Sequence, residues 1–585
     1  MGDYLLVARA PDNGAARELS ADLQQLASRE DFAITQLNAH CWLGVRGPAP
    51  PHWRWVGGWL LIGDVFDRRS PRLPRPFADD PWAYERKLVS RMWGRYIGVL
   101  FERGDQPAAL LRDPSGAMEC VAWTQENLTL VSSGAEEWLV RRLQPPWRIN
   151  VGRVGEALHG LVAGTGALLI DGPTALEPGT VQPFPLTRAA SAIWTPAELA
   201  DRSLDPPPPI DEAADTIRTA IDEAVAGLAS LGGPLGAEVS GGLDSSIVAA
   251  SLKRSHRGTV SVWLNAYGST PESDERPYVT TLGRALGFEP MCVEHALGAI
   301  TPDWLTSLSG GLRPGLNGLD HAQECSWASL LQKSGTAALM TGKGGDSVLF
   351  QSATTDVFTD IWLAAGWRAL GYRDLPELAA TNEISVWSMI QSARRHQPEV
   401  PLTLLRTHPM LSPLSKAPPP HPWLTDLKRF GPGKRFQIAG VADSVSHHGP
   451  SVLTKAVDVR HPLCAQPVVE ACLGLPTSLL TIGGRDRGLA RLAHRDRLPA
   501  EIVDRRTKGE MTRVYGRMIA ENLDVLRPWL ADGRLASWGI IDRNAALNCL
   551  TPEALIWQGQ HAAVLTAAAF ESWARKWDAL LSPAH

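Results

Sequence analysis

Short apolar runs between Gly, Pro and Asp turns make up most of the first 200 residues. This pattern predicts a β-rich region with few long helices. The clearest runs are 59–63, 97–102, 109–111 and 128–132. Four consecutive prolines follow at residues 206–209, and neither a helix nor a sheet continues through such a stiff stretch. We therefore predict two domains, 1–204 and 211–585, joined by a linker over 205–210.

Beyond the prolines, the pattern alternates between helices and strands. Apolar residues at helical spacing predict a helix over 211–228, and a second helix is expected over 277–286. Strands are expected at 235–239, 259–264, 290–293 and 337–340. This alternation predicts a parallel sheet that binds ligands at the carboxyl ends of its strands. From about residue 360 the pattern is mainly helical, with a loop expected at 413–422.

Composition is that of an ordinary soluble protein, with 44% apolar and 20% charged residues among 585. A net charge of −5 argues against general binding of nucleic acid or of membrane surfaces. No apolar run approaches the roughly 20 residues that span a bilayer. The seven cysteines are dispersed without C-x-x-C spacing, and no secretory signal is visible. We therefore expect a cytoplasmic protein with reduced thiols.

A glycine-rich loop follows the strand expected at 235–239 and precedes a helix. Its residues are Ser240, Gly241, Gly242, Leu243, Asp244, Ser245 and Ser246. Backbone N–H groups, hydroxyls and a helix N-terminus favour an anion, and Asp244 favours Mg²⁺ carried by a nucleotide. The loop lacks the lysine of the G-x-x-x-x-G-K-[ST] motif. It resembles the S-G-G-x-D-S loop of ATP pyrophosphatases, which holds pyrophosphate while an acid becomes an acyl-adenylate. A simple Gly/Ser turn is the alternative, and residues 309–312 are such a turn without Asp-Ser.

A second glycine-rich segment follows the strand expected at 337–340. Its residues are Thr341, Gly342, Lys343, Gly344, Gly345, Asp346 and Ser347. At the carboxyl end of a neighbouring strand, Asp346 would lie opposite Asp244, and the two carboxylates would share one Mg²⁺–pyrophosphate unit. The alternative is a turn that ends in an Asp cap.

A basic run at 505–508 ends in Lys508. Such a run is often a solvated turn. However, displacement of AMP from an adenylate passes through an oxyanion, and a fixed ammonium such as that of Lys508 would stabilise it.

Together these motifs resemble the asparagine synthetase superfamily over nearly the whole chain. The matching segments are 93–96 and 112–116 (G-x-Y … R-D-x-x-G), 342–347 (G-x-G-x-D-E, with Ser347 in place of Glu), 458–463 (E-x-R-x-P-F) and 487–491 (K-x-L-L-R, with Arg487 in place of Lys). The resemblance implies an α/β protein with a degenerate, glutaminase-like αββα domain of the N-terminal nucleophile type. The second domain is then adenine-nucleotide α-hydrolase-like, with a parallel sheet and a helical C-terminal part.

The resemblance also implies roles for individual residues. ATP would be bound by Ser240, Gly241, Gly242, Asp244, Ser245, Ser246, Gly344 and Arg487. Asp244 and Asp346 would hold Mg²⁺ and act in catalysis. Lys508 falls on the lysine that stabilises the ring-closing intermediate in β-lactam synthetases. Lys343 either contacts substrate or phosphate during catalysis, or is a solvent-facing loop lysine.

Two departures from the superfamily pattern point to one branch of it. Gly2 stands where a glutamine-dependent synthetase needs Cys, so we expect no glutaminase activity. Lys343 stands where asparagine synthetases carry Glu and β-lactam synthetases carry Tyr. The segment 342–350 resembles lasso peptide cyclases instead, in which an Asp or Glu side chain of a ribosomally made precursor is adenylated and attacked by the peptide's own N-terminal amine. With a pKa of about 7.7–8.0, that amine is partly neutral in the cytosol.

The lasso cyclase resemblance implies ATP and Mg²⁺ as requirements, a precursor peptide as substrate, and a leader peptidase and a leader-recognition protein as partners. Three alternatives stay open. They are a β-lactam synthetase-like enzyme that acts on a small amino acid, an ammonia-dependent asparagine synthetase, and a non-catalytic scaffold. The intact loop at 240–246, Asp346 and Lys508 speak against the scaffold.

Overall fold

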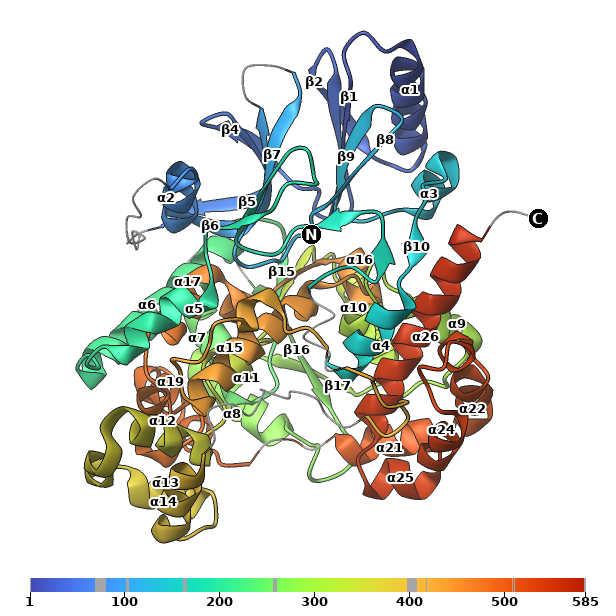
Figure 1. Cartoon of the computed structure of the whole chain (residues 1–585). Coiled ribbons are helices and arrows are strands. Elements are labelled where there is room, and N and C mark those ends of the chain that lie inside the picture. Colours follow the sequence, from blue (N-terminus) through green and yellow to red (C-terminus); the bar gives the residue numbers. More distant parts are fainter. Residues whose placement is uncertain are drawn as a thin grey trace.

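The computed structural model describes residues 2–68, 80–101, 105–160, 166–255, 260–396, 408–416, 418–507, 509 and 511–582, with backbone only at 512–513. Two six-stranded antiparallel sheets form the N-terminal domain, drawn in blue to teal in Figure 1. The first has the order β12-β8-β9-β1-β3-β2 and the second has the order β14-β13-β7-β6-β5-β4. The first sheet comprises β1 (Asp3–Arg9), β2 (Ala33–Asn38), β3 (Cys41–Arg46), β8 (Val121–Gln125), β9 (Leu128–Ser132) and β12 (Thr174–Ala175). The second comprises β4 (Trp53–Val56), β5 (Trp59–Asp67), β6 (Met92–Phe101), β7 (Pro107–Arg112), β13 (Thr180–Pro183) and β14 (Ser191–Ala192).

Strand alternation explains how these sheets pack. In β1, Leu6 belongs to the apolar cluster between the two sheets, whereas its neighbours Leu5 and Val7 pack with α1 (Gly14–Arg29) on the outer face. On the second sheet, α2 (Ala83–Arg91) and α6 (Ile210–Ala229) cover the outer face. The two antiparallel sheets are thus packed face to face between helices, but α6 belongs to the second domain and not to residues 1–204. All four predicted β-runs lie in strands, and residue 102 of one of them lies outside the described residues.

A five-stranded parallel sheet forms the centre of the second domain, in the order β17-β16-β15-β18-β19. Its strands are β15 (Leu235–Glu238), β16 (Val260–Tyr267), β17 (Pro290–Glu294), β18 (Ala338–Met340) and β19 (Asp458–Arg460). The chain runs outward from β15 in one direction and then returns to β18 on its other side, so β15 and β18 flank the topological switch point. The helices predicted over 211–228 and 277–286 are α6 and α8 (Arg276–Leu286).

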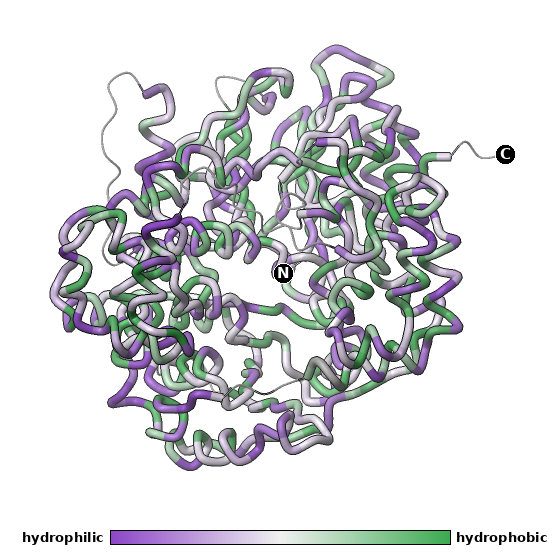
Figure 2. The backbone as a smooth tube through the Cα atoms, turned by 60° about the horizontal axis from the view of Figure 1, so that its bottom comes forward, coloured by the Kyte–Doolittle hydropathy of each residue, from purple (hydrophilic) through white to green (hydrophobic). Residues whose placement is uncertain are grey.

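Helices cover both faces of this sheet. On one face, α6, α7 (Leu243–Arg254), α8 and α19 (Gly488–Ala493) share an apolar cluster with the sheet. On the other face, α10 (His321–Lys333) and α16 (Val452–Ala456) pack against β16 and β18. Figure 2 shows hydrophobic positions concentrated in interior segments. In the described part of the chain, no helix combines the length and the apolar character that crossing a membrane needs.

The C-terminal part is helical, as predicted, and packs back on the N-terminal domain. The apolar cluster around α26 includes Leu5 and Trp147 of that domain. The described residues of the loop predicted at 413–422 contain no helix before a 3-10 turn at Pro422–Leu424. Residue 417 lies outside the described residues. The remaining elements are α3 (Glu137–Leu143), β10 (Arg148–Ile149), α4 (Val151–His159), β11 (Ile170–Asp171), α5 (Pro196–Ala200), α9 (Pro302–Ser307), α11 (Gly345–Val348), α12 (Thr355–Ala365), α13 (Leu375–Thr381), α14 (Val386–Arg395), α15 (Pro432–Ser444), α17 (Gln466–Leu473), α18 (Thr477–Leu480), α20 (Ala500–Val503), α21 (Thr512–Ala520), α22 (Leu523–Ala531), α23 (Arg534–Ser537), α24 (Arg543–Cys549), α25 (Pro552–Trp557) and α26 (His561–Leu581).

Buried ion pairs join the two domains. Arg95 on β6 donates to Asp458 on β19 at 3.0 Å and also pairs with Asp64 on β5. Arg460 donates to the other oxygen of Asp458 at 2.7 Å. All four side chains are at most a tenth exposed. Asp458, the acidic residue of the segment 458–463 that matches E-x-R-x-P-F, therefore lies in the domain interface.

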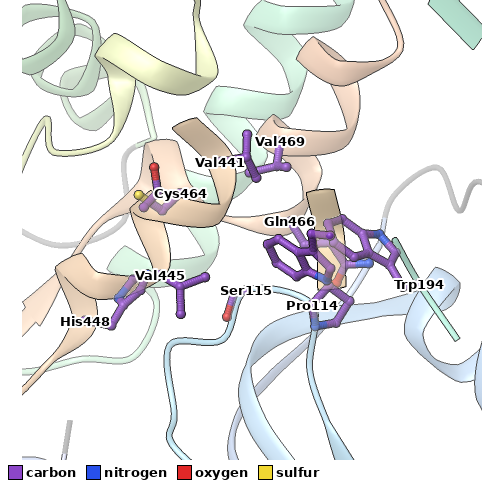
Figure 3. A pocket seen from close by; sticks show the side chains of 11 residues that line it. Pro114, Ser115, Trp194, Val441, Val445, His448, Cys464, Gln466 and Val469 are labelled. Carbon is purple, nitrogen blue, oxygen red and sulfur yellow. The ribbon is translucent and has the colours of Figure 1, made fainter. Parts of the chain in front are cut away.

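A small cavity also lies in this interface. Figure 3 shows Pro114 and Ser115, which follow β7, facing Val441 and Val445 at the end of α15. Its volume of about 10 Å³ is room for about one water molecule.

Candidate active site

The two glycine-rich loops lie side by side at the switch point. The first follows β15 and the second follows β18, and these strands pair directly. A Cβ atom on Gly342 would lie 2.5 Å from the backbone nitrogen of Ser245, and one on Gly345 would lie 2.4 Å from the carboxyl carbon of Asp244. Only glycine at 342 and 345 therefore lets the loops approach this closely.

Internal hydrogen bonds shape the first loop. Gly241 has a φ of +71°, and a Cβ there would lie 2.7 Å from the Cβ of Tyr278. The Ser245 hydroxyl accepts from the Ser240 backbone N–H at 3.0 Å, and the Ser246 hydroxyl donates to the Gly242 carbonyl at 2.7 Å. These bonds fix the turn so that the N-terminus of α7 opens onto a cavity, the setting that favours an anion.

The carboxylates of Asp244 and Asp346 meet at one guanidinium group. Arg487 Nη1 donates to Asp244 Oδ2 at 2.6 Å and to Asp346 Oδ1 at 2.7 Å, while its other nitrogens contact Asp486. Burial alone lowers the pKa of Arg487, but the three carboxylates outweigh burial and raise that pKa above its ordinary value. The sequence-based expectation that Asp346 lies opposite Asp244 matches this geometry.

The same two carboxylates fit Mg²⁺. Their oxygens converge on one positively charged group, and carboxylate oxygen is the ligand that Mg²⁺ prefers. Among the described residues, no group of three or more His, Cys, Asp and Glu is placed to hold a metal ion. Two protein carboxylates are the usual set where phosphate and water complete the coordination.

Two further arginines line the same cavity. Arg505 donates to the Gly241 carbonyl at 3.1 Å, pairs with Glu275 at 2.8 Å and lies over the ring of Tyr278. Arg491 is held by the carboxylate of Asp486 at 2.8 Å. Sequence reasoning assigned neither a role, although Arg491 is the last residue of the K-x-L-L-R match and Arg505 begins the basic run.

The cavity at the switch point has a volume of about 410 Å³. Of the residues predicted from the sequence, its lining includes Ser240, Gly242, Asp244, Ser245, Lys343, Asp346 and Arg487. Gly241, Ser246 and Gly344 are outside the lining and shape the two loops instead. Lys508 lies outside the described residues.

Lys343 extends along the wall of this cavity. Its ammonium donates to Asn317 Oδ1 at 2.6 Å. Desolvation lowers the pKa of this amine, against the opposing effect of Glu324 and Glu238. Sequence reasoning missed both carboxylates, which line the cavity together with Asp320.

A second cavity, of about 1190 Å³, lies next to the first. His295 lines the first cavity and Leu297 the second, so one short segment separates them. On the other side, Tyr515 of α21 donates to Asp320 Oδ2 at 2.8 Å, while its neighbour Val514 lines the second cavity. Trp557, which is 77% exposed, also lines the second cavity.

The fold and the site define a class of protein, a nucleotide-binding α/β enzyme with a phosphate loop and paired carboxylates at its switch point. The model of the asparagine synthase family matches residues 216–575, and the chain belongs to this family. It is thus an asparagine synthase-like enzyme that forms amides at the expense of ATP, and the family uses ATP with Mg²⁺. No curated protein matches the chain.

Proposed function

We propose that this chain is a lasso peptide cyclase, which joins an Asp or Glu side chain of a precursor peptide to the N-terminal amine of the same peptide. The observation that carries the proposal is the cavity of about 1190 Å³ beside the candidate ATP site. Ligand pockets for small molecules span about 300–1,000 Å³, so this space exceeds what a single amino acid needs. A peptide held in a folded form before ring closure requires such a space.

The N-terminal domain supports a substrate amine, and not ammonia from glutamine, as the nucleophile. A Cβ atom at Gly2 would stand 1.9 Å from the backbone oxygen of Arg46, so the backbone there leaves no room for a thiol side chain. Cys41 and Cys120 are both fully buried between the sheets. Burial raises the pKa of Cys120 to about 12, which leaves almost no thiolate at neutral pH.

Activation of the carboxylate would take place at the two glycine-rich loops. A side-chain oxygen of the peptide attacks the α-phosphorus of ATP, a P–O bond forms, and the bond to the β-phosphate breaks. The departing pyrophosphate is held by loop 240–246, with Arg487 and Arg505 as nearby cations. Asp244 and Asp346 would hold Mg²⁺, which would neutralise part of the phosphate charge.

Ring closure follows as acyl transfer. The peptide amine attacks the acyl carbon, a C–N bond forms, and the C–O bond to AMP breaks. We assign stabilisation of the oxyanion to Lys508, on its position in the family pattern. The proposal expects genes for a short precursor, a leader peptidase and a leader-recognition protein beside the gene of this chain.

The test incubates the full chain with ATP, Mg²⁺ and the leader-free form of that precursor. The product should be lighter by one water and should resist carboxypeptidase, and Asp244→Ala should abolish both changes. Turnover of a small amino acid, with no change in the peptide, would refute the proposal.

A further inference from the structure

Strand alternation divides the cavity at the switch point between the two faces of the sheet. Ala237 of β15 packs with α7 on the face that carries the phosphate loop. Gly236 faces α10 instead, because a Cβ there would lie 3.2 Å from Leu331 of that helix. Glu238, two residues on, faces the same way.

Three carboxylates gather on this α10 side of the cavity. We call Glu238, Asp320 and Glu324 the acidic wall; all three line the cavity. Asp320 stands immediately before α10 and Glu324 lies in its first turn. The charge of Asp320 acts on both Glu238 and Glu324, and Lys343 acts on both of them with opposite sign. Burial raises the pKa of Glu238 and of Glu324.

The acidic wall carries three carboxylates beside one lysine ammonium, and His295, whose Nε2 lies 3.4 Å from Asp320 Oδ1, adds positive charge only when it is protonated. A second cation would complete the charge balance. Among the described residues, no group of three or more His, Cys, Asp and Glu is placed to hold a metal ion. An alkylammonium, which carries one positive charge and donates three hydrogen bonds, is a cation that separate carboxylates can bind.

Two buried donors on the same helix point to a second feature of the ligand. Gln323 is 5% exposed and Trp327 is 8% exposed, and both line the cavity. Gln323 Nε2 and Trp327 Nε1 have no hydrogen-bond partner among the described residues. Unsatisfied buried donors are costly, so they indicate an acceptor supplied by the ligand.

We propose that the acidic wall holds the attacking N-terminal ammonium of the substrate peptide, and that Gln323 and Trp327 bind a carbonyl oxygen next to it. This inference rests on the proposed function. A peptide N-terminus offers a cation and an acceptor within one residue, which is the pair of features that this side of the cavity requires. Free ammonia offers no acceptor.

The wall also accounts for the protons of ring closure. The ammonium gives one proton to a wall carboxylate and becomes a neutral amine. The amine then forms the C–N bond with the acyl carbon, and AMP leaves with the electron pair of the broken C–O bond. The second proton leaves the nitrogen as the intermediate collapses, and both pass through the wall to solvent.

The test compares two forms of the leader-free precursor peptide, one with a free N-terminal amine and one N-acetylated, in ATP–pyrophosphate exchange by the full chain. Exchange reports activation of the side-chain carboxylate and does not need ring closure. We expect the wild type to show a KM for the free amine about tenfold below that for the acetylated form, the scale of one charge-assisted hydrogen bond.

Near-isosteric variants show which carboxylates of the acidic wall bind the peptide ammonium. In Glu238→Gln and Glu324→Gln, the ratio of the two KM values should fall toward one, with the KM for ATP unchanged. Glu324→Gln keeps an acceptor for the Leu453 N–H, which lies 3.3 Å away. Asp303→Asn, which removes an exposed carboxylate on α9, is the matched control and should keep the wild-type ratio.

The outcomes separate the two proposals. A ratio near one in the wild type, or an unchanged ratio in both variants, overturns the inference while cyclisation still supports the proposed function. No exchange with either peptide overturns both.

A separate experiment tests whether Gln323 and Trp327 bind the peptide carbonyl. Gln323→Met and Trp327→Phe should raise the KM for both peptide forms and leave the KM for ATP unchanged. A rise in the KM for ATP alone would assign these donors to the purine and would overturn their assignment to the peptide.

Discussion

The substitution Gly342→Ala tests whether activity depends on the close contact between the two glycine-rich loops. A Cβ atom at position 342 would stand 2.5 Å from the Ser245 nitrogen and 2.9 Å from the Asp244 carbonyl carbon. Both are backbone atoms of the first turn of α7, so they cannot rotate away as the tip of a side chain can. The loops must therefore separate by about 1 Å to restore ordinary contact distances.

The separation should affect activity much more than stability. Overpacking of this kind costs about 1–3 kcal/mol of the free energy of unfolding. The same displacement moves Asp244 relative to Asp346, and a misplacement of about 1 Å at reacting groups costs about 100-fold in rate.

The assay is ATP–pyrophosphate exchange with the leader-free peptide, together with a thermal melt of each variant. Gly371→Ala is the matched control, because its Cβ would meet no atom within 4 Å. We expect exchange to fall about 100-fold in Gly342→Ala and to stay at the wild-type level in Gly371→Ala. Wild-type exchange by a folded Gly342→Ala protein would refute the argument that the two loops act as one rigid unit.

Charged side chains at the site and at the domain interface should each have a measurable effect. Asp346→Asn should raise the Mg²⁺ concentration for half-maximal exchange by at least about tenfold, measured by titration; an unchanged midpoint would remove Asp346 from the metal site. Arg487→Ala removes the cation that contacts both Asp244 and Asp346, so ATP–pyrophosphate exchange should fall by at least about tenfold; exchange at the wild-type rate contradicts this. Burial alone raises the pKa of Asp458, but Arg95 outweighs it and holds that pKa well below its ordinary value. This stabilisation is complete above the unfolded pKa of about 3.9 and is lost as pH falls through the folded pKa. Asp458→Asn should therefore cost about 3–5 kcal/mol in urea unfolding at neutral pH and flatten the acid side of the stability curve; wild-type stability would contradict it.

Local patterns predicted that the two glycine-rich loops meet. The loop at 240–246 and the segment at 341–347 each follow a short apolar strand, and parallel strands bring their carboxyl ends together. This property of parallel strands was enough to predict that Asp244 and Asp346 lie opposite each other. The helix over 211–228 was equally clear, because apolar residues recur at helical spacing from Ile217 to Leu228.

Other features depend on distant parts of the chain. No local pattern marks Asp320 and Glu324 as partners of Glu238, because α10 reaches the sheet only after a long crossover. Strand β19 has three residues, too few for a periodic signal, and its Asp458 pairs with Arg95 of the other domain. The cavity of about 1190 Å³ combines segments from residues 269–299 and 514–559, so no single segment reveals it.

In the proposed reaction, a side-chain carboxylate of the peptide becomes an acyl-adenylate before the amine of the same peptide attacks. The most direct measurement uses the leader-free peptide with ¹⁸O in its Asp or Glu side chain, and mass spectrometry of the products after reaction with ATP. We expect one ¹⁸O atom in AMP and a macrolactam that keeps the other. Unlabelled AMP, or label in pyrophosphate or inorganic phosphate, would contradict it.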